Sequence, residues 1–289
     1  MWTSNVPNSS PVPNGILVII GGKEDKGSDK EVLNGDENSS RLKVLERFIK
    51  LIEKDDPVVE VVTTASSMGD ESFEDYRKVF EELGVKQIGH MHHKVRREVV
   101  DDDLSERVQN ADAFFFTGGD QLLLTSLYGG SMFLTHIKER YITDRIVIAG
   151  TSAGAMAMST PMIYAGNKKV QQIAGEVKIT TGLEFLKDVC IDTHFIDRSR
   201  FVRMAQVIVT NPTSIGIGIE EDTAIVVREG TKAEVIGNGV ITIIEGFYIT
   251  NSNISDFAED QPIGIQDLKV HLLPAGFFYD IPQINPPHK

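Results

Sequence analysis

The sequence is poor in cysteine, in long apolar runs and in positive charge. Its only cysteine is Cys190, so the chain cannot build a disulfide framework. No apolar run approaches the roughly 20 residues that a membrane-spanning helix needs, and we expect no contact with a membrane. Positive charge is scarce because 29 Lys and Arg stand against 42 Asp and Glu. The net charge of −13 argues against nucleic acid as a partner.

What remains is the composition of a soluble globular protein, with 41% hydrophobic and 25% charged residues. A chain of 289 residues suffices for one large domain or two small ones. Because it contains neither an internal repeat nor a linker, we expect one domain over residues 15–289. Residues 1–14 are polar and lack the cationic-then-apolar pattern of a signal peptide, so we expect a loose tail on a cytoplasmic protein. Cys190 lies in an apolar run and is predicted to be a buried thiol.

Apolar strands alternate with amphipathic helices through the first half of the chain. This pattern predicts an α/β fold with a mostly parallel sheet flanked by helices. The predicted strands are Ile16–Ile20, Val58–Val62, Val85–Ile88, Ala113–Phe116 and Ile146–Ala149. The predicted helices are Ser40–Lys54, Glu71–Leu83, Asp101–Asn110, Leu122–Tyr128 and Phe133–Arg140.

Four of these strands end in clusters of Gly, Ser or Thr. In parallel sheets, ligands bind beyond the carboxyl ends of the strands. We therefore expect the four clusters to lie along one edge and to form a site. They are Gly21-Gly22, Thr63–Ser67, Thr117–Gln121 and Gly150–Gly154.

The second half of the chain predicts a β-rich C-terminal part. Short strands are expected at Met162–Tyr164, Glu176–Thr180 and Val189–Asp192, then a helix over Ile196–Thr210. Ile215–Ile219 and Ala224–Val227 are predicted to be antiparallel strands. Lys232–Ile236 and Val240–Glu245 are predicted to form a hairpin across Gly237-Asn238-Gly239. Leu268–Leu273 and Phe277–Tyr279 would complete this part.

The strand that ends at Ala149 runs into Gly150-Thr151-Ser152-Ala153-Gly154, followed by small residues that suit a helix. This is the G-x-S-x-G pattern of a nucleophile elbow, in which a tight turn holds the Ser hydroxyl above the sheet. Backbone N–H groups at the start of the helix point to the place where an oxyanion would form. A Gly-rich turn whose Ser only caps a helix is the alternative interpretation.

A serine nucleophile needs a base, and the base needs an acid. His194 directly follows a predicted strand, whereas His271 lies inside an alternating one and is the weaker candidate. Glu220 and Glu221 end another strand and face opposite ways, so only one of them is expected to reach the site. The order Ser, His, Glu differs from the Ser, acid, His order of α/β-hydrolases. The other histidines are His90, His92, His93, His136 and His288, and we expect neither a metal nor a cofactor.

Arg198, Arg200 and Arg203 follow His194, and the last two are three residues apart and share a helix face. Guanidinium groups suit planar carboxylates, so these side chains could bind one in a substrate. The alternative is that they pair with acidic side chains of the chain itself, such as Asp192, Asp197 or Asp144.

These motifs together resemble the cyanophycinases, a serine peptidase family that also includes the α-aspartyl dipeptidases. The likeness runs from Ile16 almost to the C-terminus. The matching motifs are Gly21-Gly22 with Glu24-Asp25, Thr117-Gly-Gly-Asp-Gln121, Gly150-Thr-Ser-Ala-Gly154, Asp192-Thr-His-Phe195, the three arginines, and Gly218-Ile-Glu-Glu-Asp-Thr-Ala224. The resemblance implies a flavodoxin-like fold close to the class I glutamine amidotransferases, with Ser in place of Cys.

The resemblance also implies an activity. The protein would be a cytoplasmic homodimer that hydrolyses cyanophycin, a polyaspartate with arginine on each β-carboxylate, to β-Asp-Arg dipeptides. Ser152 would be the nucleophile, His194 the base and Glu221 the acid. The oxyanion hole would use Ala153 and either Gly119 or Asp120. The implied substrate-binding residues are Gln121, Asp192, Arg198, Arg200 and Arg203.

One loop departs from the family pattern. Residues 166–175 contain Lys168 and Lys169, where the family is richer in Gly and Ser beside the substrate pocket. The two cations could repel an arginine side chain or bind a free carboxylate. An α-aspartyl dipeptidase or related aspartyl-peptide peptidase is therefore one alternative function. A binding protein with a dead site on the same scaffold is another.

Overall fold

The computed structural model describes residues 11–24, 26, 42–165, 176–255 and 261–282. Its larger sheet has eight strands in the order β18-β13-β12-β1-β5-β4-β2-β3. The strands from β1 to β3 in that order are parallel, as predicted, and β12, β13 and β18 extend the sheet in antiparallel fashion. The strands are β1 (Ile16–Ile20), β2 (Val58–Val62), β3 (Gln87–Met91), β4 (Ala113–Phe116), β5 (Val147–Thr151), β12 (Thr223–Arg228), β13 (Lys232–Gly237) and β18 (Phe278–Asp280).

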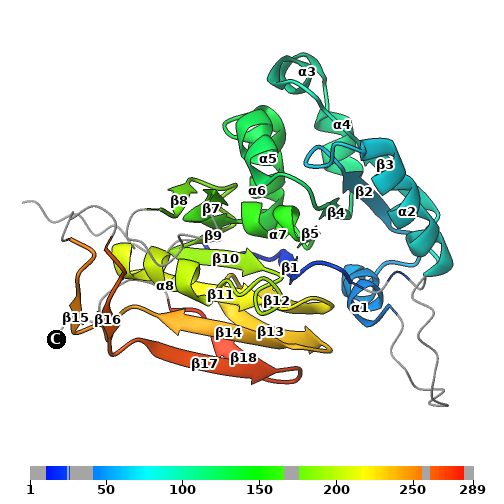
Figure 1. Cartoon of the computed structure of the whole chain (residues 1–289). Coiled ribbons are helices and arrows are strands. Elements are labelled where there is room, and N and C mark those ends of the chain that lie inside the picture. The colour runs from blue at the N-terminus through cyan, green and yellow to red at the C-terminus, as the bar shows by residue number, and fades with distance from the viewer. Residues whose placement is uncertain (1–10, 25, 27–41, 166–175, 256–260, 283–289) are drawn as a thin grey trace, which may run out of the picture.

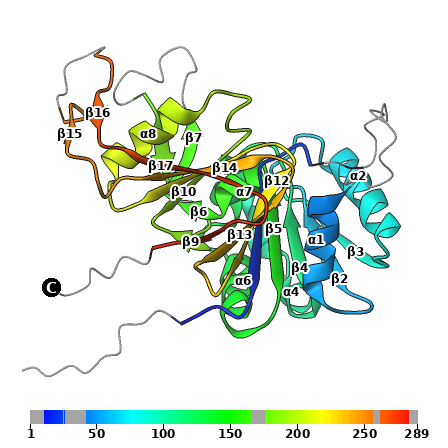
Figure 2. The same ribbon diagram turned by 90° about the horizontal axis from the view of Figure 1, so that it is seen from below.

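Helices cover both faces of this sheet (Figures 1 and 2). Successive residues of β1 point to opposite faces, so Val18 packs in the core beneath α1 and α2, whereas Leu17 and Ile19 pack in the core beneath α4 to α7. The helices are α1 (Lys43–Ile52), α2 (Gly69–Glu82), α3 (Arg96–Asp101), α4 (Ser105–Asn110), α5 (Gln121–Tyr128), α6 (Met132–Thr143), α7 (Ala153–Ala157) and α8 (Phe201–Thr210). The predicted α/β class is confirmed.

A second sheet of six strands, in the order β17-β14-β11-β10-β6-β9, was not expected as a separate layer. One of its faces packs against α8, where Met204 and Ile208 contribute to the core. Its other face shares a continuous core with the larger sheet (Figure 1). The strands are β6 (Ser159–Thr160), β9 (Leu186–Lys187), β10 (Val189–Thr193), β11 (Ile215–Ile219), β14 (Val240–Glu245) and β17 (Lys269–Pro274).

Two predicted strand pairings are wrong. β13 and β14 do not form a hairpin, and β11 does not pair with β12, because each connection crosses from one sheet to the other. β13 pairs with β12, and β14 pairs with β11 and β17. The two crossings are joined to each other, since the Asn238 N–H donates to the Asp222 carbonyl at 3.0 Å. A Gly-Asn-Gly turn allows a sharp reversal, but long-range pairing decides which partner each strand takes.

Three predicted helices begin later than expected. The helix expected over Ser40–Lys54 spans Lys43–Ile52. The helix expected over Asp101–Asn110 starts at Ser105, because the Asp103 carboxylate accepts the Ser105 N–H at 3.1 Å and so ends the Asp run outside the helix. The helix expected from Ile196 starts at Phe201, after a turn in which Ser199 has a left-handed backbone, with φ 53°. Cys190 is buried, as predicted. Within the described ranges, no helix is both long and apolar enough to cross a bilayer.

Candidate active site

Ser152 lies at a strained turn between β5 and α7. Its φ of 50° and ψ of −111° place it in a region that non-glycine residues seldom adopt. The Ser152 N–H donates to the Ile20 carbonyl at 3.1 Å, which fixes the turn to β1. Gly154 allows α7 to approach the sheet, because a Cβ there would lie 2.2 Å from the Phe116 carbonyl oxygen. Strand, turn and helix therefore have the arrangement of a nucleophile elbow.

His194 reaches Ser152 from the second sheet. It follows β10 directly, and its Nε2 lies 3.0 Å from the Ser152 Oγ. The His194 N–H donates to the Gly21 carbonyl at 2.9 Å, so the end of β1 also fixes the histidine backbone. Gly22 leaves space for the ring, because a Cβ there would lie 2.5 Å from its Cε1 and Nε2 atoms. This close approach explains the second glycine of the Gly21-Gly22 pair.

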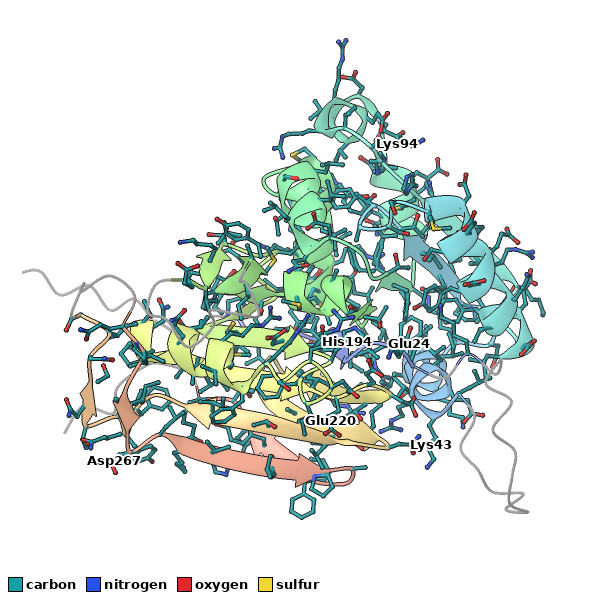
Figure 3. The ribbon with its side chains drawn as sticks, in the orientation of Figure 1. Glu24, Lys43, Lys94, His194, Glu220 and Asp267 are labelled. Carbon is teal, nitrogen blue, oxygen red and sulfur yellow. The ribbon has the colours of Figure 1, made fainter. Side chains whose placement is uncertain are left out.

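Glu221, and not Glu220, lies at the histidine. Oε1 of Glu221 is 2.7 Å from His194 Nδ1, which completes a line of hydrogen bonds from Ser152 through the imidazole to a carboxylate. Glu220 turns the opposite way, and its Oε2 accepts the Val240 N–H at 2.7 Å (Figure 3). The two neighbours therefore differ in role, because one bonds to His194 and the other ties β11 to the start of β14.

Lys23 also contacts Glu221, although no sequence motif includes Lys23. Its Nζ lies 2.9 Å from Oε1 of Glu221, the same oxygen that bonds to His194. Lys23 is 69% exposed, so water screens this ion pair. The only signal in the sequence is its place directly after Gly21-Gly22, and no pattern links it to a glutamate 198 positions away.

The electrostatics suit a neutral histidine beside an ionised carboxylate. Burial lowers the pKa of His194, and the positive charges of Arg198 and Arg200 lower it further, against the opposing effect of Glu221. Burial alone would raise the pKa of Glu221, but hydrogen bonds from Lys23 and His194 outweigh it and hold that pKa below its ordinary value. His194 can therefore accept a proton near pH 7, and Glu221 can stabilise the cation that forms.

The N–H groups of Ala153, Gly119 and Asp120, which are expected in an oxyanion hole, differ in whether they already form a hydrogen bond. The Asp120 N–H donates to the Ala65 carbonyl at 2.9 Å and is thereby occupied. Gly119 precedes it in the loop that follows β4, and Ala153 follows Ser152 at the first position of α7. Among the hydrogen bonds between described residues, none uses the N–H of Gly119 or Ala153. The pair left for an oxyanion is thus Ala153 and Gly119.

The residues expected to bind substrate fall into two groups. Asp192 is fully buried, and its carboxylate accepts from Arg200 Nη1 at 2.7 Å and from Arg203 Nε at 2.5 Å. Arg203 is itself buried, so Asp192 and Arg203 form an internal ion pair. Arg198 is exposed, and Arg200 is partly so. The alternative that these arginines pair with acidic side chains of the chain itself is therefore correct for Arg203. It is correct in part for Arg200, which binds Asp192 but is partly exposed.

Gln121 begins α5, and its Nε2 donates to the Ile163 carbonyl at 2.7 Å. This bond connects the loop after β4 with β7 (Met162–Ala165). Lys168 and Lys169, which are predicted to lie beside the substrate, are outside the described residues.

Four of the other histidines form hydrogen bonds to neighbouring side chains, and His136 lies on α6. His271 Nε2 lies 2.9 Å from Oε1 of Glu245 within the second sheet. His90 and His92 both contact the Thr63 hydroxyl, and His93 contacts the Tyr128 hydroxyl. No group of three or more His, Cys, Asp or Glu side chains suited to a metal occurs in the part of the chain that the structure describes. His288 lies outside that part.

Comparison with known proteins places the chain in a family. Residues 33–235 match the model of peptidase family S51. A cyanophycinase of Geminocystis herdmanii is 31% identical over 91% of this chain and 93% of its own length. A cyanophycinase of Synechococcus elongatus is 27% identical over 95% of this chain and 82% of its own.

Solved structures agree on the fold. A peptidase from an acI-B1 actinobacterium superimposes with a TM-score of 0.64 at 20% identity, over 94% of this chain and 99% of its own. A protein of Listeria monocytogenes described as a putative peptidase E gives a TM-score of 0.52 at 19% identity, over 78% of this chain and 99% of its own. At these identities the likeness concerns the fold alone.

Proposed function

The chain belongs to peptidase family S51 and is a serine-type hydrolase, and on that premise we propose that it is an exopeptidase that cleaves cyanophycin to β-Asp-Arg dipeptides. Ser152, His194 and Glu221 are the proposed triad. The observation that carries the proposal is the continuous line of hydrogen bonds, 3.0 Å from Ser152 Oγ to His194 Nε2 and 2.7 Å from His194 Nδ1 to Glu221. The relatives named cyanophycinase support the substrate.

The first half of the proposed reaction forms an acyl-enzyme. His194 Nε2 accepts the Ser152 proton while Oγ attacks an aspartyl carbonyl carbon, and Glu221 stabilises the imidazolium. The N–H groups of Ala153 and Gly119 would donate to the oxyanion of the tetrahedral intermediate. His194 then gives its proton to the leaving amine as the peptide bond breaks.

The second half releases the acyl group with water. His194 accepts a proton from the water molecule, whose oxygen attacks the acyl carbonyl and forms a second tetrahedral intermediate. As the ester bond breaks, His194 returns the proton to the Ser152 oxygen. The enzyme regains its starting state, and in this half the proton moves only between water, His194 and the Ser152 oxygen.

For binding, we propose that Arg198 and Arg200 face the substrate. Both are close enough to lower the pKa of His194 by repulsion. Their guanidinium groups suit a carboxylate of the substrate. Asp192 and Arg203 would hold Arg200 in place from behind, because both are buried and Asp192 binds Arg200 and Arg203 together. Gln121 would shape the opposite wall through its bond to β7.

The deciding experiment supplies cyanophycin and α-aspartyl dipeptides in parallel and measures the products by mass spectrometry. Release of β-Asp-Arg from cyanophycin, with little cleavage of the dipeptides, is the expected result. Preference for α-aspartyl dipeptides would identify the alternative peptidase. Failure on both substrates, together with no labelling of Ser152 by a fluorophosphonate, would favour a binding protein with a dead site.

We also propose that residues 15–289 act as one hydrolytic domain. The core that runs without interruption from the eight-stranded to the six-stranded sheet supports this. Homodimer formation and a cytoplasmic location are further proposals, and both rest on the family resemblance. Sedimentation of the purified chain would test the first, and fractionation of cells that express it would test the second.

A further inference from the structure

The end of β1 contacts every member of the proposed triad or its chain neighbour. Three consecutive carbonyl groups accept one backbone N–H each from the connections that carry the catalytic side chains. Such a run of bonds from one short segment fixes three otherwise separate loops to a common reference. The bonds run from Ser152 to Ile20 (3.1 Å), from His194 to Gly21 (2.9 Å) and from Asp222 to Gly22 (3.0 Å).

Glu24 continues this segment with a side-chain bond toward the nucleophile. Oε2 of Glu24 accepts the hydroxyl of Thr151 at 2.6 Å, and Thr151 is the residue directly before Ser152. Its other oxygen, Oε1, accepts the hydroxyl of Tyr76 from α2. Glu24 follows Gly22, which lies against the His194 ring, and Figure 3 labels Glu24 and His194 in the same part of the view. One carboxylate therefore joins the β1 loop, the elbow and a covering helix.

The hydrogen bond between Glu24 and Thr151 is buried. Glu24 is 5% exposed and Thr151 2% exposed, so water cannot replace either partner. Burial, followed by the negative charge of Glu24, raises the pKa of Tyr76, which keeps its hydroxyl protonated as a donor. A buried carboxylate is expensive unless its oxygens are hydrogen-bonded, and both oxygens of Glu24 are. The reaction described above makes no use of Glu24.

We propose that Glu24 is a positioning residue for the nucleophile, acting through Thr151. Ser152 has a strained backbone, and such a conformation persists only where its surroundings hold it. The Glu24–Thr151 bond fixes the residue on one side of Ser152, and α7 fixes the other side. This inference rests on the proposed role of Ser152. It adds that Oγ keeps its place relative to His194 because Glu24 holds the end of β5.

The test compares removal of the two hydroxyls that Glu24 binds. Thr151→Val removes the hydroxyl beside Ser152, Thr151→Ser keeps it, and Tyr76→Phe removes the bond on the side of α2. The measurement is the second-order rate of Ser152 labelling by a fluorophosphonate, with the melting temperature of each variant. Labelling reports the reactivity of Oγ without any assumption about substrate.

We expect Thr151→Val to slow labelling about tenfold, because small displacements of a reacting atom cost large factors in rate. Thr151→Ser should label within about twofold of the wild-type rate. Tyr76→Phe should label within about threefold of the wild-type rate, although we expect both Tyr76→Phe and Thr151→Val to lower the melting temperature. Equal slowing by Thr151→Val and Tyr76→Phe would overturn the proposal, because loss of stability alone would then account for both.

A second variant covers the case in which Thr151→Val does not fold. Glu24→Leu is close to the glutamate in size and has no acceptor atom, so it removes the bond to Thr151 together with the bond to Tyr76. It should slow labelling severalfold, and an unchanged rate would also overturn the proposal. If the wild-type chain is not labelled at Ser152 at all, the proposed function itself fails, which separates the two outcomes.

Discussion

The two sheets contribute different halves of the proposed chemistry. The eight-stranded sheet carries Ser152 after β5 and Gly119 after β4. Ser152 would attack the substrate carbonyl carbon, and the Gly119 N–H would donate to the oxyanion that forms. The six-stranded sheet carries His194 after β10 and leads into Glu221 after β11, which would move the proton. The 3.0 Å between Ser152 Oγ and His194 Nε2 therefore depends on how the sheets pack. Neither sheet alone contains the complete proposed triad.

The largest effect should come from the nucleophile of the first sheet. Ser152→Ala removes the attacking oxygen and leaves the second sheet untouched, so kcat should fall by about 10⁴-fold or more. The melting temperature should change little. Turnover of cyanophycin by the purified variant measures this, and near-normal turnover would mean that the reaction does not use Ser152.

The second sheet can be tested with two adjacent glutamates. Glu221→Gln should lower kcat on the order of 10³-fold, because an amide cannot stabilise the imidazolium as a carboxylate does. Glu220→Gln is the matched control. It should keep kcat within about threefold, because its carboxylate accepts the Val240 N–H and faces away from His194. Parallel kinetics of the two variants decide the matter, and a reversed ranking would assign the acid to Glu220.

Asp192 should matter more for stability than for proton transfer. Asp192→Asn leaves Arg203 buried without its counter-charge and should cost about 3–5 kcal/mol of unfolding free energy. Asp197→Asn is the control, because Asp197 is exposed in the turn that follows, and it should cost less than about 0.5 kcal/mol. Urea denaturation gives both values. Equal losses would show that the buried ion pair contributes nothing particular.

A smaller effect concerns the pH dependence of the proposed base. His194 accepts a proton only when neutral, and burial together with Arg198 and Arg200 holds its pKa below the ordinary 6.5 against the pull of Glu221. The value of kcat/KM should therefore stay constant near pH 7 and fall as the pH drops through that lowered pKa. A pH–rate profile with its acid limb above pH 6.5 would contradict this assignment.

Lys23 should shift that limb slightly. Its ammonium shares Oε1 of Glu221 with His194, so Lys23→Met leaves more of the carboxylate charge to the imidazolium. The pKa of His194 should then rise, and the acid limb should move up by less than about one pH unit. Lys26→Met is the control, because Lys26 lies over the Tyr76 ring instead. Identical profiles for the two variants would remove Lys23 from the site.

The sequence predicts β1, β2, β4 and β5 of the first sheet well, because these strands are mostly apolar runs that end in small polar residues. β3 lies at Gln87–Met91, two residues later than the predicted Val85–Ile88 begins. The strand predicted at Ile146–Ala149 lies at Val147–Thr151, and the turn at Ser152 follows from local pattern. Helix α3 (Arg96–Asp101) is not predicted. The second sheet was missed as a separate layer. Gly237-Asn238-Gly239 has the local chemistry of a hairpin, but the pairing of β14 with β11 and β17 is settled by long-range contacts.

The site shows the same division between local and long-range information. The elbow at Ser152 and the strand end at His194 are visible in local pattern. Alternation along the chain shows that Glu220 and Glu221 face opposite ways, but only the fold shows which side holds His194. The contact of Glu24 with Thr151 joins residues 127 positions apart, and no local pattern encodes it.

The most direct test of the central claim is mass-spectrometric mapping of a fluorophosphonate adduct on the intact protein and on His194→Ala. If a nucleophile from the eight-stranded sheet is activated by a base from the six-stranded sheet, the adduct should map to Ser152. Labelling of His194→Ala should then be slower by at least about 100-fold. An adduct at another residue, or equal labelling of the two proteins, would contradict the account.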